Sequence, residues 1–169
     1  MSRKRWHPPA TGWAKINVDG SVSRNSSRAA IGGVLRGPSG GWLVGFRMRT
    51  GMFDIFSIEA KVVLEGLKLA WNRGFGQAEL ECDNVLLVDV LRNGLATISS
   101  IVEIRLIHEW CSKDWQIKFR HISRDSNKVA DQLAKMDEDI INCLVTLEDS
   151  PLSVRDLLEK DIYNLSMDA

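Results

Sequence analysis

The 169 residues include 22 Lys and Arg and 22 Asp and Glu, so the formal net charge is zero, which argues against a protein that binds nucleic acid through overall positive charge alone. Charges break every apolar stretch well short of about 18 residues, which excludes a membrane-spanning helix, and the N-terminus has no apolar segment typical of a signal peptide. The three cysteines form no Cys-x-x-Cys pair, so we expect an intracellular, non-secreted protein without disulfides or a zinc site, and nothing distinguishes nucleus from cytoplasm.

The charges are unevenly distributed along the chain. Residues 1–50 contain nine Lys and Arg and one acid, whereas residues 51–149 contain eleven Lys and Arg and seventeen acids. A basic first third beside an acidic remainder predicts a phosphate-binding face combined with an acidic metal pocket. The candidate phosphate contacts are Arg24, Arg28, Arg36 and Arg47.

After an extended approach over residues 1–12, the chain is predicted to form three strands, at residues 14–22, 29–36 and 42–49. Asp19, the only acid among the first fifty residues, follows the apolar part of the first strand. Asp19 and Gly20 could form a two-residue hairpin turn without chemical function. The polar cluster at residues 23–28 is the better turn, which leaves Asp19 available as a metal ligand.

A helical apolar period begins at Asp54 or Ser57 and is closed by glycines at residues 74 and 76. Glu59 lies near the start of this helix. One interpretation is an acid that complements the helix dipole. Glu59 shares a face with Val62, Val63 and Gly66, however, so it is expected at the buried rim, where an unpaired charge is costly and a cationic partner is favoured.

The rest of the chain alternates strands and helices. A strand at residues 78–83 precedes helices at residues 84–93 and 99–113, and a strand at residues 115–122 precedes a helix at residues 127–137. Asp83 follows the first of these strands, where it could equally serve as an N-cap or as a metal ligand. Asp131 lies on the last helix.

This order of elements predicts an α/β fold with a mixed sheet, in which the four acids approach one rim. We expect one domain over residues 13–140 and a helical extension over residues 141–169. Leucines and an isoleucine recur at helical spacing in residues 150–169, so that helix is expected to dock on the domain or to mediate self-association with a second copy.

Residues 6–140 resemble the type 1 ribonuclease H family, and more closely the ribonuclease H-like domain of plant non-LTR retroelement-derived proteins. Glu59 and an ordered set of segments carry the resemblance: residues 13–21, 31–36, 64–70, 81–84 and 121–134. The spacing of His121, Asn127 and Asp131 in the last segment is its most specific feature.

The resemblance implies a five-stranded mixed sheet, three antiparallel strands followed by two parallel additions, with helices on both faces. It also implies an endoribonuclease that hydrolyses the RNA strand of RNA–DNA hybrids with two Mg²⁺ ions, for which Mn²⁺ can substitute, and without a small-molecule cofactor or a membrane partner. The expected catalytic residues are Asp19, Glu59, Asp83, Asp131 and His121, and the expected additional nucleic-acid contacts are Asn84 and Asn127.

In this scheme Asp19 bridges both ions, Asp131 holds the ion on the nucleophile side, and Glu59 and Asp83 hold the other. Glu59 also lies near the ribose 2′-hydroxyl, and His121 assists proton transfer or product release from a mobile loop, although it could equally be a strand-end surface histidine. The chain lacks the basic protrusion of many cellular relatives, so the alternative is a catalytically silent or weak nucleic-acid-binding module retained from a retroelement.

Overall fold

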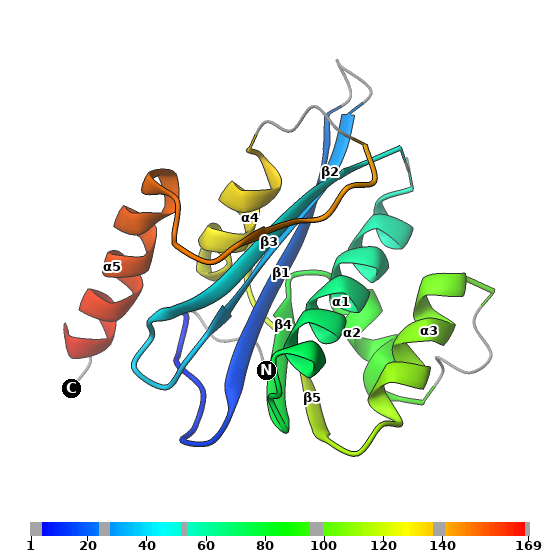
Figure 1. The fold of residues 1–169 in the computed structure, drawn as a ribbon, viewed down its shortest axis with the longest axis horizontal. Helices are drawn as coiled ribbons and strands as arrows, with labels where there is room; N and C mark the ends of the chain where they lie inside the picture. The colour runs from blue at the N-terminus through cyan, green and yellow to red at the C-terminus, as the bar shows by residue number, and fades with distance from the viewer. Residues whose placement is uncertain (1–4, 24–27, 52–53, 95–99, 137–140, 168–169) are drawn as a thin grey trace.

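The structure, a computed structural model, describes residues 5–23, 28–51, 54–94, 100–136 and 141–167 of the chain. The side chains of Arg28, Ser166 and Met167 are also outside the description. One mixed sheet carries helices on both faces (Figure 1), which confirms the predicted α/β class.

The sheet is built on a central first strand. The strands are β1 (Ala14–Ser23), β2 (Arg28–Arg36), β3 (Trp42–Thr50), β4 (Gln77–Cys82), β5 (Gln116–His121) and β6 (Val145–Leu147). Their order across the sheet is β5-β4-β1-β2-β3-β6. The first three strands form the predicted antiparallel meander, and β4 and β5 add in parallel on the other side of β1.

The predicted number of strands is wrong by one, because β6 adds a sixth strand antiparallel to β3. This strand is only three residues long and pairs with Gly45–Arg47, about a hundred residues earlier in the chain. Three residues are too few to show an alternating pattern, and a partner so distant in sequence leaves no local signal. The segment after residue 140 therefore contributes a strand as well as a helix.

The helices are α1 (Ile55–Asn72), α2 (Val85–Arg92), α3 (Val102–Cys111), α4 (Lys128–Ala134) and α5 (Leu152–Met167), with a short 3-10 turn η2 (Arg124–Ser126) before α4. The side chain of Asp54 caps α1 by accepting a hydrogen bond of 3.0 Å from the backbone N–H of Ser57. No helix in the described ranges has the length and apolar character needed to cross a membrane.

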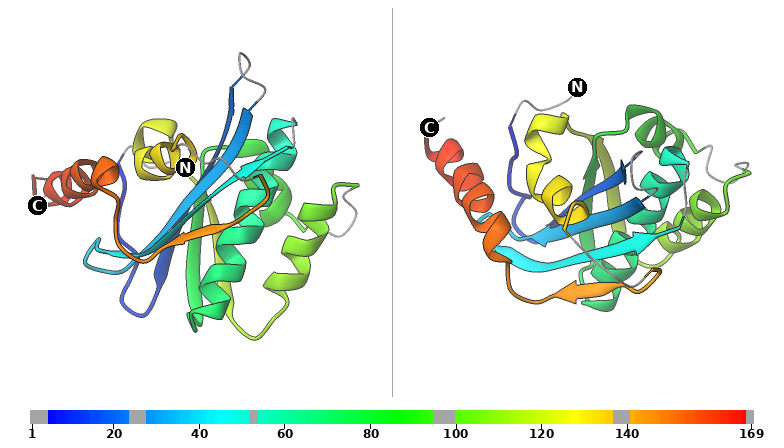
Figure 2. Two further views of the ribbon diagram at one scale, coloured as in Figure 1. Left: turned by 45° about the horizontal axis from the view of Figure 1, so that its top comes forward. Right: turned by 90° about the horizontal axis from the view of Figure 1, so that it is seen from above.

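Alternation along β1 separates two layers. Ile16 and Val18 face α1, where Gly66 allows the helix backbone to approach them closely. On the other face of the sheet Gly32 lies against the backbone of α4 at Leu133. Figure 2 shows α4 and α5 on one side of the sheet and α1 to α3 on the other.

Helix α5 packs on its own chain. Val154 and Leu158 are buried in a cluster with residues of β2 and α4, and Arg36 of β2 forms an ion pair of 2.7 Å with Asp161 of α5. Self-association through this segment and the boundary of the domain at residue 140 stay predictions.

The fold predicts that Gly32→Ala lowers the free energy of unfolding by about 1–3 kcal/mol. A Cβ atom there would lie 2.3 Å from the backbone nitrogen of Ala134, so α4 must move off the sheet. Chemical denaturation measures the effect. Gly76→Ala is the matched control, because a Cβ atom at Gly76 meets nothing within 4 Å; equal stability of the two variants would contradict the close packing of α4.

Candidate active site

Asp19 occupies the central strand of the sheet and is only 5% exposed. Strand β1 continues through Gly20 to Ser23, paired with β2, so Asp19 and Gly20 lie within a strand and do not form a hairpin turn. One carboxylate oxygen of Asp19 accepts a hydrogen bond of 3.0 Å from the backbone N–H of Gly20.

Helix α1 delivers Glu59 to the same place. A Cβ atom on Gly20 would lie 2.8 Å from the Ile58 side chain and 3.4 Å from the Glu59 carboxyl carbon, so glycine is what allows this approach. Glu59 is 4% exposed, and a buried acid does not fit the alternative of a solvated acid that complements the helix dipole.

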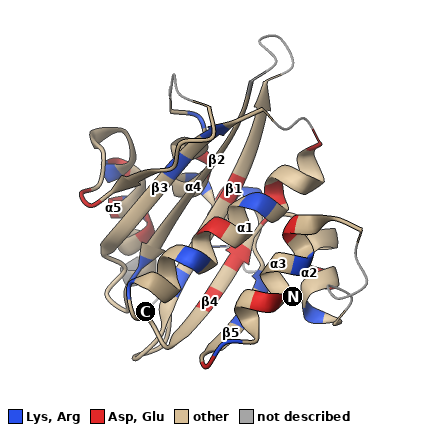
Figure 3. Cartoon of the chain, turned by 45° about the vertical axis from the view of Figure 1, so that its right-hand side comes forward, with Lys and Arg blue, Asp and Glu red and all other residues tan. Residues whose placement is uncertain are grey.

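Asp83 follows β4 directly and is half-buried. Asn84, and not Asp83, is the N-cap of α2, since its side chain accepts a hydrogen bond of 3.1 Å from the backbone N–H of Leu87. Among the described residues, Asp19, Glu59 and Asp83 each present a carboxylate oxygen such that the three atoms lie within 4.8 Å of one another. Figure 3 shows acidic positions gathered on β1, β4 and α1.

Asp131 joins the edge of this group from α4. It lies outside the tight group of three, but it is close enough for its charge to raise the pKa of Asp19. Its carboxylate forms an ion pair of 2.9 Å with Lys135, one helical turn later. The four acids predicted from the sequence are therefore neighbours, with Asp131 at the periphery.

Burial and mutual repulsion leave these carboxyl groups protonated over an unusual pH range. Burial, followed by the charges of Glu59, Asp83 and Asp131, raises the pKa of Asp19 to about 9. Burial and the charge of Asp83 raise the pKa of Glu59 to about 8. The pKa of Asp83 is also raised, mainly by burial.

The donor set fits divalent cations. Clustered carboxylate oxygens are the ligands that Mg²⁺ and Mn²⁺ prefer. The Oε2 atom of Glu59 is buried and has no hydrogen-bond partner among the described residues, and such an atom is costly unless a cation or a donor satisfies it. The cluster therefore supports a metal site by its composition and by this unsatisfied oxygen.

A cleft of about 750 Å³ opens onto the cluster and is lined by Asp19, Glu59 and Asp131 together with two basic residues, Arg124 and Lys135. Neither basic residue was predicted from the sequence to belong to the site. Their signal was available: Lys135 follows Asp131 by four residues, and Arg124 lies between His121 and the last helix. They place positive charge at the mouth of an acidic site.

His121 is the last residue of β5, in register with Cys82, so the expectation of a loop position is wrong. It lines a second cleft of about 710 Å³, formed mainly by residues of β5 and α2. Its Nε2 atom lies 3.2 Å from the carbonyl oxygen of Asp83. A carbonyl only accepts, so Nε2 carries a hydrogen in this contact.

Several of the predicted nucleic-acid contacts do not reach the surface. Arg36 is 1% exposed because it packs on Trp6 and pairs with Asp161, and Asn127 is 2% exposed within a hydrogen-bond network, so burial corrects both predictions.

The other predicted nucleic-acid contacts lie in different surroundings. Asn84 uses its side-chain oxygen to cap α2. Arg47 is half-buried on β3, opposite Gly32 of β2 and therefore on the face that α4 covers. Arg24 lies outside the described residues, as does the side chain of Arg28.

Comparisons with known proteins agree on one family. A family model described as reverse transcriptase-like matches residues 17–137. The chain is 35% identical over 130 residues to an Arabidopsis thaliana protein that is named as a ribonuclease H protein. These residues are 76% of this chain and 21% of that protein. The chain thus spans about one fifth of the length of that relative.

Solved structures share the fold. Ribonuclease H1 of the halophilic archaeon Halobacterium salinarum has a TM-score of 0.63 at 25% identity, covering 72% of this chain and 94% of that chain. A ribonuclease H1 isolated from compost, solved in complex with an RNA/DNA hybrid, has a TM-score of 0.61 at 20% identity, covering 71% of this chain and 92% of that chain.

The raised pKa values predict how stability depends on pH and metal. Folded-state pKa values of about 9 for Asp19 and 8 for Glu59 lie above the ordinary values of 3.8 and 4.5. Between the ordinary pKa values and the raised ones, the folded chain therefore binds more protons than the unfolded chain. The metal-free protein should lose stability as the pH rises from the ordinary pKa values toward about 8 and 9. Thermal unfolding in chelator at pH 6 and pH 8 measures the loss.

Mg²⁺ or Mn²⁺ should replace the protons and raise the unfolding temperature more at pH 8 than at pH 6. Asp19→Asn should weaken both the pH dependence and the response to metal. Asp114→Asn, at an exposed position between α3 and β5, should retain both. An unfolding temperature of the unmodified protein that is insensitive to metal at both pH values would contradict the site.

Proposed function

The chain belongs to the reverse transcriptase-like family of ribonuclease H-like domains, and from that premise we propose that it is an endoribonuclease hydrolysing the RNA strand of RNA–DNA hybrids with two divalent metal ions. The observation that carries the proposal is the convergence of Asp19, Glu59 and Asp83 within 4.8 Å, with Asp131 beside them. A cluster of carboxylates is suited to a metal-dependent phosphodiesterase, because paired divalent cations need several oxygen ligands.

Asp19, Glu59, Asp83 and Asp131 would hold the ions. Bound there, a pair of Mg²⁺ ions would activate water and stabilise the leaving 3′ oxygen. The chain itself contributes a fixed geometry, since β1, α1, β4 and α4 each present one acid from a packed element. Bound cations would take the place of the protons that the raised pKa values of Asp19 and Glu59 retain.

Arg124 and Lys135 are the residues we assign to the substrate backbone. Both line the cleft over the acidic cluster, and guanidinium and ammonium groups bind phosphate oxygens through charge-assisted hydrogen bonds. The choice of an RNA–DNA hybrid rests on the family and on the hybrid seen with the compost ribonuclease H1. Recognition of RNA would come from a 2′-hydroxyl close to Glu59.

The decisive experiment incubates the protein with labelled RNA–DNA hybrid, double-stranded RNA, single-stranded RNA and duplex DNA, each in Mg²⁺ and in Mn²⁺. Only the RNA strand of the hybrid should be cut, leaving 5′-phosphate and 3′-hydroxyl ends. Asp19→Asn should lose nearly all cleavage while keeping its circular dichroism spectrum, because an amide cannot neutralise bound cations as a carboxylate does. Asp114→Asn controls for the loss of one acid.

Hybrid binding without cleavage of any substrate, in both metals, would reject the nuclease and leave the alternative of a catalytically silent binding module. Cleavage in excess chelator, or full activity of Asp19→Asn, would reject the metal-dependent mechanism. The two results are separated by measuring hybrid affinity in parallel with turnover.

His121→Ala is predicted to slow hybrid cleavage by about 100-fold without abolishing it, since loss of one general acid or base costs at least about that factor. His121 contacts the backbone carbonyl of Asp83 and does not belong to the group of side chains that could hold a metal ion. Its loss should therefore leave Mn²⁺ affinity unchanged. His108→Ala, an exposed histidine on α3, is the control, and a weakened Mn²⁺ affinity in His121→Ala would contradict the assigned role.

A further inference from the structure

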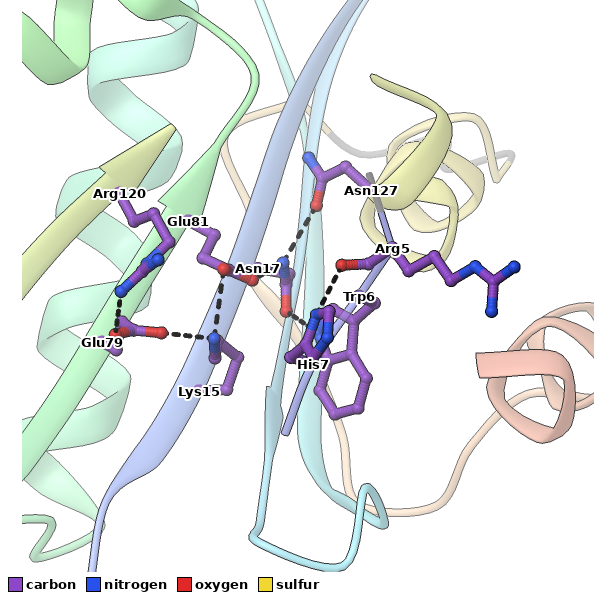
Figure 4. A network of polar contacts seen from close by, with 9 residues as sticks. All are labelled: Arg5, Trp6, His7, Lys15, Asn17, Glu79, Glu81, Arg120 and Asn127. Carbon is purple, nitrogen blue, oxygen red and sulfur yellow. Dashed lines mark hydrogen bonds and ion pairs between the residues drawn. The ribbon is translucent and has the colours of Figure 1, made fainter. Parts of the chain in front are cut away.

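Figure 4 shows a network of polar contacts whose centre is the side chain of Asn17, two residues before Asp19 on β1. The Asn17 side chain is 2% exposed. Its Oδ1 atom accepts a hydrogen bond of 2.7 Å from the indole N–H of Trp6. Its Nδ2 atom donates to Glu81 Oε1 at 3.0 Å and to Asn127 Oδ1 at 3.2 Å.

These partners belong to the elements that deliver the carboxylates. Glu81 is on β4, two residues before Asp83. Asn127 is the residue before α4, four residues before Asp131. Asn17 itself is on the strand of the first carboxylate. One amide group therefore joins three of the four segments that carry the acidic cluster.

Trp6 determines which way this amide points. An indole N–H can only donate, so the oxygen of Asn17 must face Trp6 and its NH₂ group must face the two acceptors, Glu81 and Asn127. With its oxygen used by Asn17, Asn127 turns its own NH₂ group to the carbonyl oxygen of Val18, at 2.8 Å. Each orientation fixes the next, from the N-terminal segment to the start of α4.

Trp6 packs against Arg36, which is itself fixed by two further contacts. The guanidinium of Arg36 lies 3.6 Å from the centre of the Trp6 ring. Arg36 in turn donates to the carbonyl oxygen of Gly40 at 2.9 Å and pairs with Asp161 of α5 at 2.7 Å. Trp6 and Asp161 both lie outside residues 17–137, the part of the chain that the family model matches.

We propose that Asn17 is a positioning residue for the acidic cluster and that Trp6, braced by Arg36 and α5, sets its orientation. The proposal rests on the proposed nuclease function only for its catalytic consequence. The segments on either side of the family region thus become part of the functional unit, because they hold an amide that aligns β1, β4 and α4.

The test uses the full chain with two variants. Trp6→Phe keeps an aromatic ring beneath Arg36 and removes only the N–H donor, and Asn17→Leu removes the amide with little change in volume. Each variant is expected to lower kcat on the hybrid by about tenfold, with KM unchanged. A loss of about tenfold corresponds to a misplacement of the acidic cluster that costs about as much transition-state stabilisation as one hydrogen bond contributes. Trp6→Phe in the Asn17→Leu background should have no further effect, because Trp6 acts through Asn17.

A second readout does not depend on cleavage. Hydrogen exchange of backbone amides in residues 82–87 and 127–134, measured without metal or nucleic acid, should become faster in both variants than in Ile107→Ala. Ile107 is buried on α3, on the other face of the sheet, so this control lowers global stability without touching the network. Mn²⁺ affinity should fall in the two variants and not in the control.

The outcomes separate the two proposals. Faster local exchange in a protein that cleaves no hybrid would remove the nuclease function and leave Asn17 as the residue that positions the cluster. Should the unmodified protein cleave hybrid while Trp6→Phe and Asn17→Leu match Ile107→Ala in exchange and in kcat, the positioning role is overturned. If Asn17→Leu does not fold, Trp6→Phe alone decides in the same way.

Discussion

Repulsion between buried carboxylates is the constraint on which this structure depends. Asp19, Glu59 and Asp83 bring three acidic oxygens within 4.8 Å of one another in surroundings poor in water. Such a group is unfavourable unless protons or cations neutralise it. The fold opposes this repulsion with rigid neighbours: β1 is paired on both sides along its first residues, and α1 approaches it closely because Gly20 has no side chain. The packing of β1 and α1 therefore keeps these carboxyl groups together against their mutual repulsion.

The sequence predicted the elements whose signals are local and missed those whose signals are distant. Local apolar patterns and turn signals correctly located β1 to β5. The helical period located α1 and left its start open between Asp54 and Ser57, and the structure has Asp54 as the N-cap. Strand β6 could not be predicted, since its three residues acquire strand geometry only through pairing with β3. The cap of α2 was expected at Asp83, as the alternative to a metal ligand, but Asn84 caps the helix because its side chain accepts a hydrogen bond from the backbone N–H of Leu87.

The site was predictable to the extent that the parallel order of strands could be expected. Asp19 lies within β1, just past the residues that pair with β4, and Asp83 directly follows β4, so the parallel pairing of these two strands brings the acids together. The roles of Asn127 and Arg36 were assigned wrongly, because a sequence pattern shows residue type and spacing but not which side of a strand or helix becomes covered. Asn127 is buried against Asn17 of β1, to which it is hydrogen-bonded. Arg36 is buried against the ring of Trp6 and pairs with Asp161 of α5.

The uneven distribution of charge along the chain has a second explanation besides nucleic-acid binding. Lys15, in the basic first third, is fully buried and forms an ion pair of 3.1 Å with Glu81 and another with Glu79, its partner in the register of β1 and β4. The pairs of Lys15 (Figure 4) join β1 to β4, and the pair of Arg36 with Asp161 joins β2 to α5, so these contacts connect segments that are far apart in sequence. Buried pairs add little net stability over apolar packing, yet loss of one partner is strongly destabilising, so they select one arrangement of strands over others. Part of the positive charge counted in the sequence is therefore used inside the fold, whereas Arg124 and Lys135, which line the cleft, are the basic groups that the proposed function assigns to a nucleic-acid backbone.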